Sequence, residues 1–549
     1  MKIRSLFSII ALSFGVSSVQ AINYSPDNVS AELLLKVPGN DAVHHSLKFE
    51  KIQNSEYDYQ LVGNKKLPLM LYQNIEGSDN CKRITMLVVA LEDVYFNYGQ
   101  LVKTASRHDD CLFYMPGFWY RRNLRSPKEA PSFHTSDSWI VREDRLSTPL
   151  TAIYDEKSGK SFSVVRIDEF DSDALTTHKE GEVILSGKTS IGYTGFENKD
   201  GISALSFGYP YREAPKTYIR KLTLAPSVEA YQFLKKGESI TLTWEVSERN
   251  VNDFSECVKQ IWEYSYDLYK PEPVNTPYSD EKMKEVLSNF FVESYVDDTP
   301  TKYYSGVELR TATCENLDVA EVGFVGRTLL NAFNALEYGE SQNRKDLVDN
   351  ANSIFDSYLQ NGFSSRGFFN EVVHFKRNFV ETNLSIRRQS EGVYAVLYYL
   401  NYEKQHGRKH PEWEKRLKTM LDAFLKLQNP DGSFPRKFKD DFSLVDKSGG
   451  STPSATLPLV MGYKYFKDKR YLEAAKRSVG YLEKELISKA DYFSSTLDAN
   501  CEDKEASLYA STAAYYLALA TKGQERAHYA ELAKKAAYFA LSWYYTWDV

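Results

Sequence analysis

From about residue 279 to the end of the chain, apolar residues recur with a period near 3.6 and no strand-like segment interrupts them. This pattern predicts a run of helices near residues 279–295, 318–338, 343–360, 385–405, 411–428, 451–467, 469–488, 502–522 and 524–546. Helices that are apolar over most of their circumference alternate with helices that are charged on one side. The alternation predicts an inner ring of helices wrapped by an outer ring, which is an α/α toroid.

The loops between these helices differ in length. Successive helices in such a ring are antiparallel, so every outer-to-inner loop opens on the same rim. These loops are long and rich in polar and aromatic residues, and they span residues 299–317, 362–384, 429–450 and 490–501. Long connections inside a compact array usually have a function. We therefore expect the functional residues on this rim, where inner-helix N-termini add partial positive charge.

A closed double ring needs more helices than this pattern supplies, and residues 542–549 are aromatic with no polar tail. We therefore expect the toroid to be incomplete at its C-terminus and the chain to be a fragment. An open or differently closed helical array is the alternative.

Residues 23–247 show short runs of β-branched and aromatic residues separated by turn signals. The segment from Asp155 to Lys160 reads as a hairpin turn with Gly159 in it. Many strands without intervening helices predict an antiparallel β-sandwich of two sheets. The predicted organisation is therefore a multidomain β + α chain: a signal peptide over 1–21, a β-sandwich over 22–250, a helical linker over 251–278 and the toroid over 279–549.

The first residues predict export. Lys2 and Arg4 precede an apolar run over residues 6–16, and small residues up to Ala21 suit signal peptidase. We expect a mature chain that begins near Ile22 in the periplasm or outside the cell, without a membrane span. The five cysteines lie far apart and form no zinc-binding pattern, and no metal or cofactor is predicted. A disulfide between Cys81 and Cys111 is one option in an oxidising compartment.

The net charge and the aromatic content narrow the classes of ligand that the chain is expected to bind. The net charge of −6 does not indicate a nucleic-acid partner. The chain has 39 Tyr, 30 Phe and 7 Trp, and aromatic rings either fill cores or stack on sugars. Trp119, in an irregular segment beside two arginines, is expected to line a sugar site or to dock onto a neighbouring domain. Phe434 is a second candidate for stacking on a sugar.

Several carboxylates fall on the predicted rim, and glycoside hydrolysis needs two of them across the bond. The catalytic candidates are Asp431, Glu391, Asp503 and Glu505, with Glu371 and Asp498 on the same rim. Each of these acids also has a structural explanation that needs no catalytic role. Asp431 is a good turn residue, Glu391 can form an ion pair with Arg388, and acids at the start of a helix are favoured by its dipole alone.

Cations gather in the same loops. The binding candidates are Arg388, Arg436, His374 and Arg377. Arginine binds carboxylates through two parallel hydrogen bonds, so an acidic sugar such as a uronate is a coherent ligand. Solvated surface charge is the alternative.

The segment Leu427-Gln428-Asn429-Pro430-Asp431-Gly432-Ser433-Phe434-Pro435 resembles a loop that many α/α-toroid carbohydrate enzymes carry after an outer helix. The predicted layout resembles exported two-domain glycoside hydrolases, the glucoamylase-like and β-glucuronidase-like families among them. The resemblance implies glycan processing. It supplies no catalytic pair, because no family residue can be aligned.

These observations predict an exported glycoside hydrolase that cleaves a poly- or oligosaccharide, with a uronic acid among the options. A polysaccharide lyase with a Tyr or His base such as His374 is the first alternative. A non-catalytic glycan-binding protein is the second. Linkage, sugar identity, stereochemistry, oligomeric state and the division of acid and base roles are not predicted.

Overall fold

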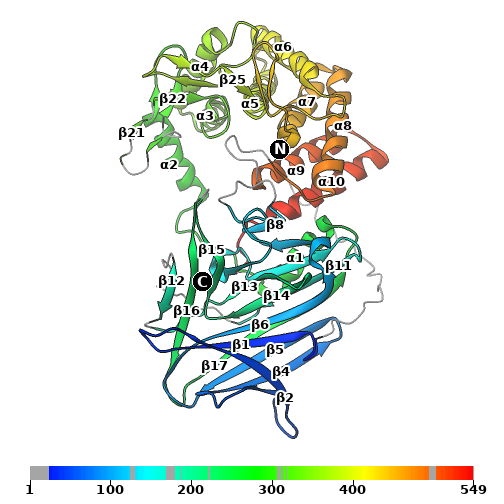
Figure 1. The fold of residues 1–549 in the computed structure, drawn as a ribbon. Coiled ribbons are helices and arrows are strands. Elements are labelled where there is room, and N and C mark those ends of the chain that lie inside the picture. Colours follow the sequence, from blue (N-terminus) through cyan, green and yellow to red (C-terminus); the bar gives the residue numbers. More distant parts are fainter. Residues whose placement is uncertain are drawn as a thin grey trace.

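The computed structural model describes residues 24–547 apart from 124–129, 169–179, 186, 221–222, 306–308, 311–312, 314, 317 and 494–501. Strands occupy the first part of the chain and helices the second (Figure 1). The predicted signal peptide lies outside the described residues, as do Asp498, Cys314 and Cys501.

The strand-rich half is one large sheet that is antiparallel except where β12 pairs in parallel with β16. Its strands are β1 Val29–Lys36, β2 Val43–Lys51, β3 Tyr59–Gly63, β4 Leu69–Ser78, β5 Cys81–Ala90, β6 Val94–Arg107, β7 Cys111–Met115, β8 Trp119–Arg121, β9 Trp139–Arg142, β10 Leu150–Asp155, β11 Lys160–Arg166, β12 Gly181–Ile184, β13 Tyr193–Lys199, β14 Ile202–Tyr209, β15 Arg212–Arg220, β16 Thr223–Leu234 and β17 Ser239–Asn250. The predicted hairpin is confirmed, because Asp155 pairs with Lys160 across the turn between β10 and β11.

The prediction of a sandwich of two separate sheets is wrong. All seventeen of these strands are hydrogen-bonded into a single sheet. Long strands make the sheet continuous: β6 pairs with β1, β14 and β16, and β17 pairs with β5 and β11. Alternation along a strand reports which side chains are buried, but it does not report that one strand continues from one layer into the next.

The helix-rich half contains short strands between its helices. The helices are α1 Phe254–Tyr269, α2 Asp280–Glu293, α3 Thr328–Gln342, α4 Lys345–Asn361, α5 Ile386–Gln405, α6 Pro411–Leu427, α7 Thr452–Phe466, α8 Lys469–Leu482, α9 Lys504–Ala520 and α10 Gly523–Leu541. The short strands are β18 Tyr295–Val296, β19 Tyr303–Tyr304, β20 Leu309–Arg310, β21 Glu315–Asn316, β22 Val319–Glu321, β23 Val372–His374, β24 Phe379–Val380, β25 Asn383–Ser385, β26 Lys437–Lys439 and β27 Leu444–Asp446. They line the long loops that the sequence placed on one rim.

The predicted helices agree closely with α2 and with α4 to α10. The segment predicted as helix from 318 begins differently. Residues 319–321 form β22, and positive φ angles at Asp318, Phe324 and Arg327 delay the start of α3 until Thr328. The segment is an apolar run that contains two glycines, and the chain turns there instead of forming a helix.

The prediction of an α/α toroid is also wrong. Figure 1 shows the helices as an arc above the sheet. Along this arc, α3 packs with α4 and α5, α5 with α6 and α7, α7 with α8 and α9, and α9 with α10. Helix α10 then packs on α1, the helix that follows the sheet. Helix amphipathicity predicts that each helix buries a face, but it does not say which neighbour covers the face at the end of the array.

One hydrophobic core joins the two halves. It contains residues of α3 to α10 together with Tyr114 and Tyr154 of the sheet and Phe254 of α1. A second core lies within the sheet around residues such as Phe96 and Trp244. The sheet and the helices therefore share buried surface.

The aromatic end of the chain docks on the sheet. Trp543 stacks on Tyr120 with ring centroids 4.6 Å apart, and Tyr114 donates a 2.8 Å hydrogen bond to Ser542. The Trp547 indole N–H donates to the carbonyl of Leu146 at 3.1 Å. Of the two roles expected for the segment around Trp119, the structure therefore supports docking.

The predicted disulfide is wrong, because Cys81 and Cys111 are both free. The Cys81 thiol lies 2.9 Å from a carboxylate oxygen of Glu245, and the Cys111 thiol lies 3.2 Å from the carbonyl of Arg107. Each sulfur therefore has a polar partner of its own.

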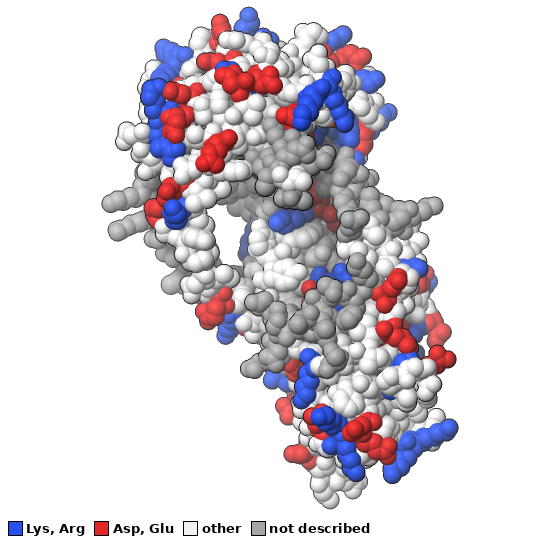
Figure 2. Space-filling model, turned by 90° about the vertical axis from the view of Figure 1, so that its left-hand side faces the viewer, with Lys and Arg blue, Asp and Glu red and all other residues white. Residues whose placement is uncertain are grey.

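Charged residues of both signs are interspersed over the face shown in Figure 2. Within the part of the chain that the structure describes, none of the helices combines the length and the apolar character needed to cross a membrane.

We predict that Trp543→Ala lowers the free energy of unfolding by about 2 kcal/mol, because it removes a partly buried ring that contacts both Tyr120 and Phe539. Urea titration of the purified protein measures the change. Tyr545→Ala is the matched control, since this neighbouring ring is 62% exposed and its loss should cost less than about 0.5 kcal/mol. Equal effects of the two substitutions would contradict the docking role of Trp543.

Candidate functional site

The N-terminal ends of α3, α5 and α9 meet in a cluster of charged and aromatic side chains. We call it the Arg387 cluster, and its members are Phe324, Arg327, Arg387, Glu391, Glu505 and Tyr509. It unites two of the predicted catalytic residues, Glu391 and Glu505, which lie more than a hundred positions apart in the chain.

Helix capping sets the positions of these side chains. Ser385 caps α5 by accepting a hydrogen bond from the Arg388 N–H at 3.4 Å. Arg387 and Glu391 are four residues apart and so share a face of α5. Asp503 caps α9 by accepting from the Glu505 N–H at 2.9 Å, which directs Glu505 toward α5. The predicted catalytic residue Asp503 therefore has a structural task and is 7% exposed.

Glu391 is the buried carboxylate of the cluster. Its side chain is 2% exposed and accepts hydrogen bonds from the Phe324 N–H, from the Tyr509 hydroxyl and from Arg387 Nε at 3.2 Å. Phe324 reaches it because its φ of +60° turns the backbone N–H inward. These donors satisfy a buried polar group that would otherwise be costly, and they fix its orientation.

Glu505 and Arg327 form the accessible edge of the cluster. Their side chains are 37% and 35% exposed. Arg387 Nη2 donates to Glu505 Oε2 at 2.7 Å. Arg327 Nη2 lies 3.7 Å from Glu505 Oε1 and 3.8 Å from Glu391 Oε1, which is too long for hydrogen bonds. Arg327 is held instead by hydrogen bonds from Nε to the Phe324 carbonyl at 2.8 Å and from Nη2 to the Tyr509 hydroxyl at 3.3 Å. Its contacts with the two carboxylates are the longer ones.

Burial and charge act on the other members of the cluster. Burial lowers the pKa of Arg387, but the nearby Tyr509, Glu391 and Glu505 more than offset this and leave the pKa above its ordinary value. Burial raises the pKa of Tyr509, and the negative charge of Glu391 raises it further. Tyr509 is therefore held as a neutral hydroxyl that donates to Glu391.

Arg388 forms a second group of ion pairs on the adjoining side of α5. Its guanidinium lies 2.6 Å from Glu321, 3.8 Å from Glu371 and 4.0 Å from Glu381. The ring of Phe324 lies between the two arginines, 4.8 Å from the Arg387 carbon and 5.6 Å from that of Arg388. The predicted pair of Arg388 with Glu391 is replaced by contacts with these three other acids, of which Glu321 is the nearest.

Glu371 is the buried acid of this second group. Burial raises its pKa to about 8, and Arg388, the Ser385 N–H and Gln389 oppose the shift only in part. Glu371 therefore carries a proton at neutral pH. Its carboxyl group is fully buried and packs against Arg388, the Ser385 N–H and Gln389, so Glu371 is a structural acid in this structure.

Asp431 and Arg436 lie elsewhere in the helical half. Asp431 accepts hydrogen bonds from the backbone and hydroxyl of Ser433 at 3.0 and 2.7 Å, which is the behaviour of a turn residue. Gly432 beside it has a φ of +90°, and a side chain there would meet the Arg477 carbonyl at 2.2 Å. Arg436 is buried and pairs with Asp446 at 3.0 Å.

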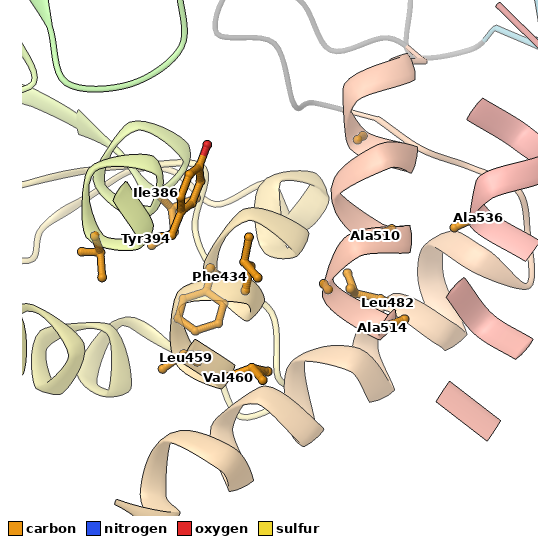
Figure 3. Packing of buried hydrophobic residues seen from close by; sticks show 14 of the residues in the cluster. Ile386, Tyr394, Phe434, Leu459, Val460, Leu482, Ala510, Ala514 and Ala536 are labelled. Carbon is orange, nitrogen blue, oxygen red and sulfur yellow. The ribbon is translucent and has the colours of Figure 1, made fainter. Parts of the chain in front are cut away.

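The other binding candidates divide into exposed and buried residues. Arg377 is exposed in the turn between β23 and β24, and His374 lies 3.4 Å from Glu381. Trp119 and Phe434 are fully buried, so the prediction that either ring stacks on a sugar is wrong. Figure 3 shows Phe434 in the helical core near Leu459 and Val460.

Sequence reasoning missed Arg327, Tyr509 and Phe324. Arg327 and Phe324 fall in the segment predicted as helix over 318–338, and Tyr509 falls within the helix predicted over 502–522. The pair Gly323 and Gly326 was the available signal. A side chain at Gly323 would meet Glu391 at 2.6 Å, and one at Gly326 would meet Glu321 at 2.5 Å. Such close approach marks a tight turn packed on the charged cluster.

Among the described residues, there is no group of three or more His, Cys, Asp or Glu side chains arranged to hold a metal ion.

No protein-family model matches the chain, and no curated protein matches it. Several solved structures show a weak likeness. The unsaturated glucuronyl hydrolase of Bacillus sp. GL1 is 13% identical over 53% of this chain and 74% of its own, with a TM-score of 0.35. Cellobiose 2-epimerase of Bacillus thermoamylovorans B4167 is 12% identical over 52% of this chain and 75% of its own, with a TM-score of 0.39. Likeness at this level does not define the function of the chain.

We predict that Glu371→Gln weakens the pH dependence of stability between pH 4.5 and 8. In this range the folded protein keeps the proton on Glu371 and the unfolded chain loses it, so the free energy of unfolding falls as pH rises. Glutamine cannot ionise but still accepts from Ser385, and the slope should decrease by about 1 kcal/mol per pH unit.

Urea titrations at pH 5, 6, 7 and 8 measure this slope. Part of the slope should persist in the variant, because burial also raises the pKa of both Glu143 and Glu213 to about 7. Glu381→Gln is the control, since it removes a half-exposed carboxylate from the same arginine. An unchanged slope in Glu371→Gln would show that Glu371 is ionised in the folded protein.

Proposed function

We propose that the protein is a carbohydrate-active enzyme that hydrolyses glycosidic bonds in an acidic poly- or oligosaccharide. The observation that carries the proposal is the shared position of Glu391 and Glu505. Oxygens of both lie within 3.8 Å of one nitrogen of Arg327, on a cluster of which Glu505 and Arg327 face solvent. Two such contacts put these oxygens no more than about 7.5 Å apart, which is compatible with the separations of about 5–9.5 Å found in glycosidase pairs.

The two carboxylates have different surroundings, and this difference suits the division of labour that hydrolysis requires. Glu391 keeps its donors from Arg387, Tyr509 and Phe324 when Arg327 moves, and we assign it the role of nucleophile or of the base that holds water. Its side chain is 2% exposed, so this role requires the substrate to displace Arg327 from it. Glu505 is half-exposed and reaches the bound sugar, where it acts as the general acid.

Arg327 contacts both carboxylates, and we assign it the binding of the sugar's acid group. Its contacts with both acids are long, so an incoming sugar carboxylate can draw it away with two direct hydrogen bonds. Glu505 then loses one of its two cationic neighbours. Glu391 loses only the weakest of its contacts. A uronic acid next to the scissile bond is therefore the substrate class that fits the cluster.

A lyase is less well supported by the cluster. Elimination needs a base that removes a carbon-bound proton, and Tyr509 is the tyrosine closest to the arginines. Its raised pKa and its hydrogen bond to Glu391 disfavour the phenolate that would act as this base. His374 pairs with Glu381 beside the Arg388 group rather than within the Arg387 cluster.

We predict that Glu505→Gln lowers kcat/KM for uronate-containing oligosaccharides by at least about 100-fold, because it removes the proton donor. New reducing ends measure hydrolysis, and absorbance in the near ultraviolet reports the unsaturated product of a lyase. The assay uses protein purified from the periplasm or the medium. Its first residue also tests the export that we propose, with cleavage near Ala21.

Glu412→Gln is the matched control for Glu505→Gln, since Glu412 is an exposed acid in the first turn of another helix, α6, and should leave the rate unchanged. Full activity of Glu505→Gln would overturn the assignment. Near-ultraviolet absorbance would indicate a lyase. Neither new reducing ends nor absorbance, with sugar binding retained, would indicate a glycan-binding protein.

We predict that Arg327→Gln raises KM for uronate substrates by about tenfold or more while neutral analogues are affected far less. The reason is the loss of the only charge-assisted contact that the proposal assigns to the sugar carboxylate. Steady-state kinetics on a uronate substrate and on its neutral, carboxyl-reduced form measure the ratio. An equal effect on both substrates would show that Arg327 acts only through Glu505.

A further inference from the structure

The strand-rich half carries a pocket that the proposed hydrolysis does not use. Its volume is about 310 Å³, which is at the lower end of the range of small-molecule sites. The described residues that line it belong to β1, β2, β6, β13, β14 and β15. The Arg387 cluster contributes none of them.

The floor of the pocket depends on glycine. Gly99 of β6 lies against Tyr193 of β13, and a side chain at this position would meet the Tyr193 hydroxyl at 2.4 Å and Glu32 at 3.2 Å. Tyr193 is 1% exposed, so the ring supports the floor from below. Only a residue without a side chain keeps this space open.

One wall of the pocket is a fixed chain of ionic contacts. Arg212 Nη1 donates to Glu32 Oε1 at 2.7 Å, and Arg212 Nε lies 3.1 Å from Glu229. The guanidinium also lies over the ring of Tyr193 at 5.4 Å. His44 lies on the rim with its Nε2 2.8 Å from Glu32 Oε2. Both oxygens of Glu32 are therefore positioned before any ligand arrives.

The charges of the lining balance and are already paired. Glu32 pairs with Arg212, and Glu197 pairs with Lys199 at 2.7 Å. A charged ligand would have to break one of these pairs and leave a partner uncompensated. Hydroxyl groups can instead use the remaining lone pairs of the carboxylates and the remaining donors of the cations. The lining thus favours an uncharged ligand rich in hydroxyl groups.

We propose that this pocket is a second carbohydrate-binding site, which takes a neutral sugar unit and performs no chemistry. It differs from the Arg387 cluster, where the proposed function assigns an acidic sugar group to Arg327. The site would hold a neutral part of a glycan on the sheet. The proposal stands without hydrolysis at the Arg387 cluster, because it requires binding alone.

Isothermal titration calorimetry on the full chain tests the proposal with neutral oligosaccharides and with uronate oligosaccharides of the same length. The Glu505→Gln protein is used beside the wild type, so that turnover does not consume the ligand. We expect saturable binding of a neutral saccharide in both proteins.

Two substitutions address the pocket without disturbing the core. Ser46→Tyr places a ring at an exposed position of the lining and should weaken neutral-sugar binding by at least about tenfold. His44→Ala removes a rim contact from a side chain that is 52% exposed and should weaken it by about fivefold. His45→Ala is the matched control, because the next residue of a strand faces the opposite side of the sheet.

Arg327→Gln should leave this binding unchanged, which separates the pocket from the Arg387 cluster. The proposal is overturned if no neutral saccharide binds, or if Ser46→Tyr and His44→Ala bind it like the wild type. Tighter binding of uronates that Ser46→Tyr abolishes would also overturn the preference for a neutral sugar. Loss of hydrolysis in Glu505→Gln has no bearing on these outcomes.

Discussion

The paired guanidinium of Arg387 is the interaction on which the arrangement of the helical half depends. Its side chain is 1% exposed, and a buried cation of this kind is tolerated only when carboxylates and aromatic faces surround it. Glu391 comes from the same helix, Glu505 from α9, and Phe324 from the turn before α3. The requirement to satisfy one charge therefore brings three helix ends together.

The next residue, Arg388, is likewise surrounded by acids, on the adjoining side of α5. It draws in Glu321 from β22 and Glu371 from the loop that leads into β23. These two acids account for two of the short strands among the helices. The pairing of β22 with β23 holds both acids near the arginine. The two consecutive arginines make the start of α5 the point where ordered loops and helix ends converge.

The helices could not adopt this arrangement in isolation from the sheet. Aromatic residues of α10 and of the segment after it pack on Tyr120, and the shared core extends from the helices to β7 and β10. The arc of helices thus ends on apolar surface that the sheet provides. Two regions of different character result, the Arg387 cluster among helix ends and a charge-balanced pocket on the strands.

Local structure was determined by the sequence itself. The period of apolar residues and the capping residues set the bounds of α4 to α10 to within a few residues, and the turn at Gly159 set a hairpin. Glu391 and Glu505 were recognised as candidates because acids at helix starts stand out in the sequence. Tertiary structure alone decided that the strands form one sheet, that the helices form an arc, and that Arg387 joins two acids 114 positions apart. The physical reason is that periodicity and capping depend on neighbours within one or two turns, whereas a buried charge and a bending strand find their partners only when distant segments pack together.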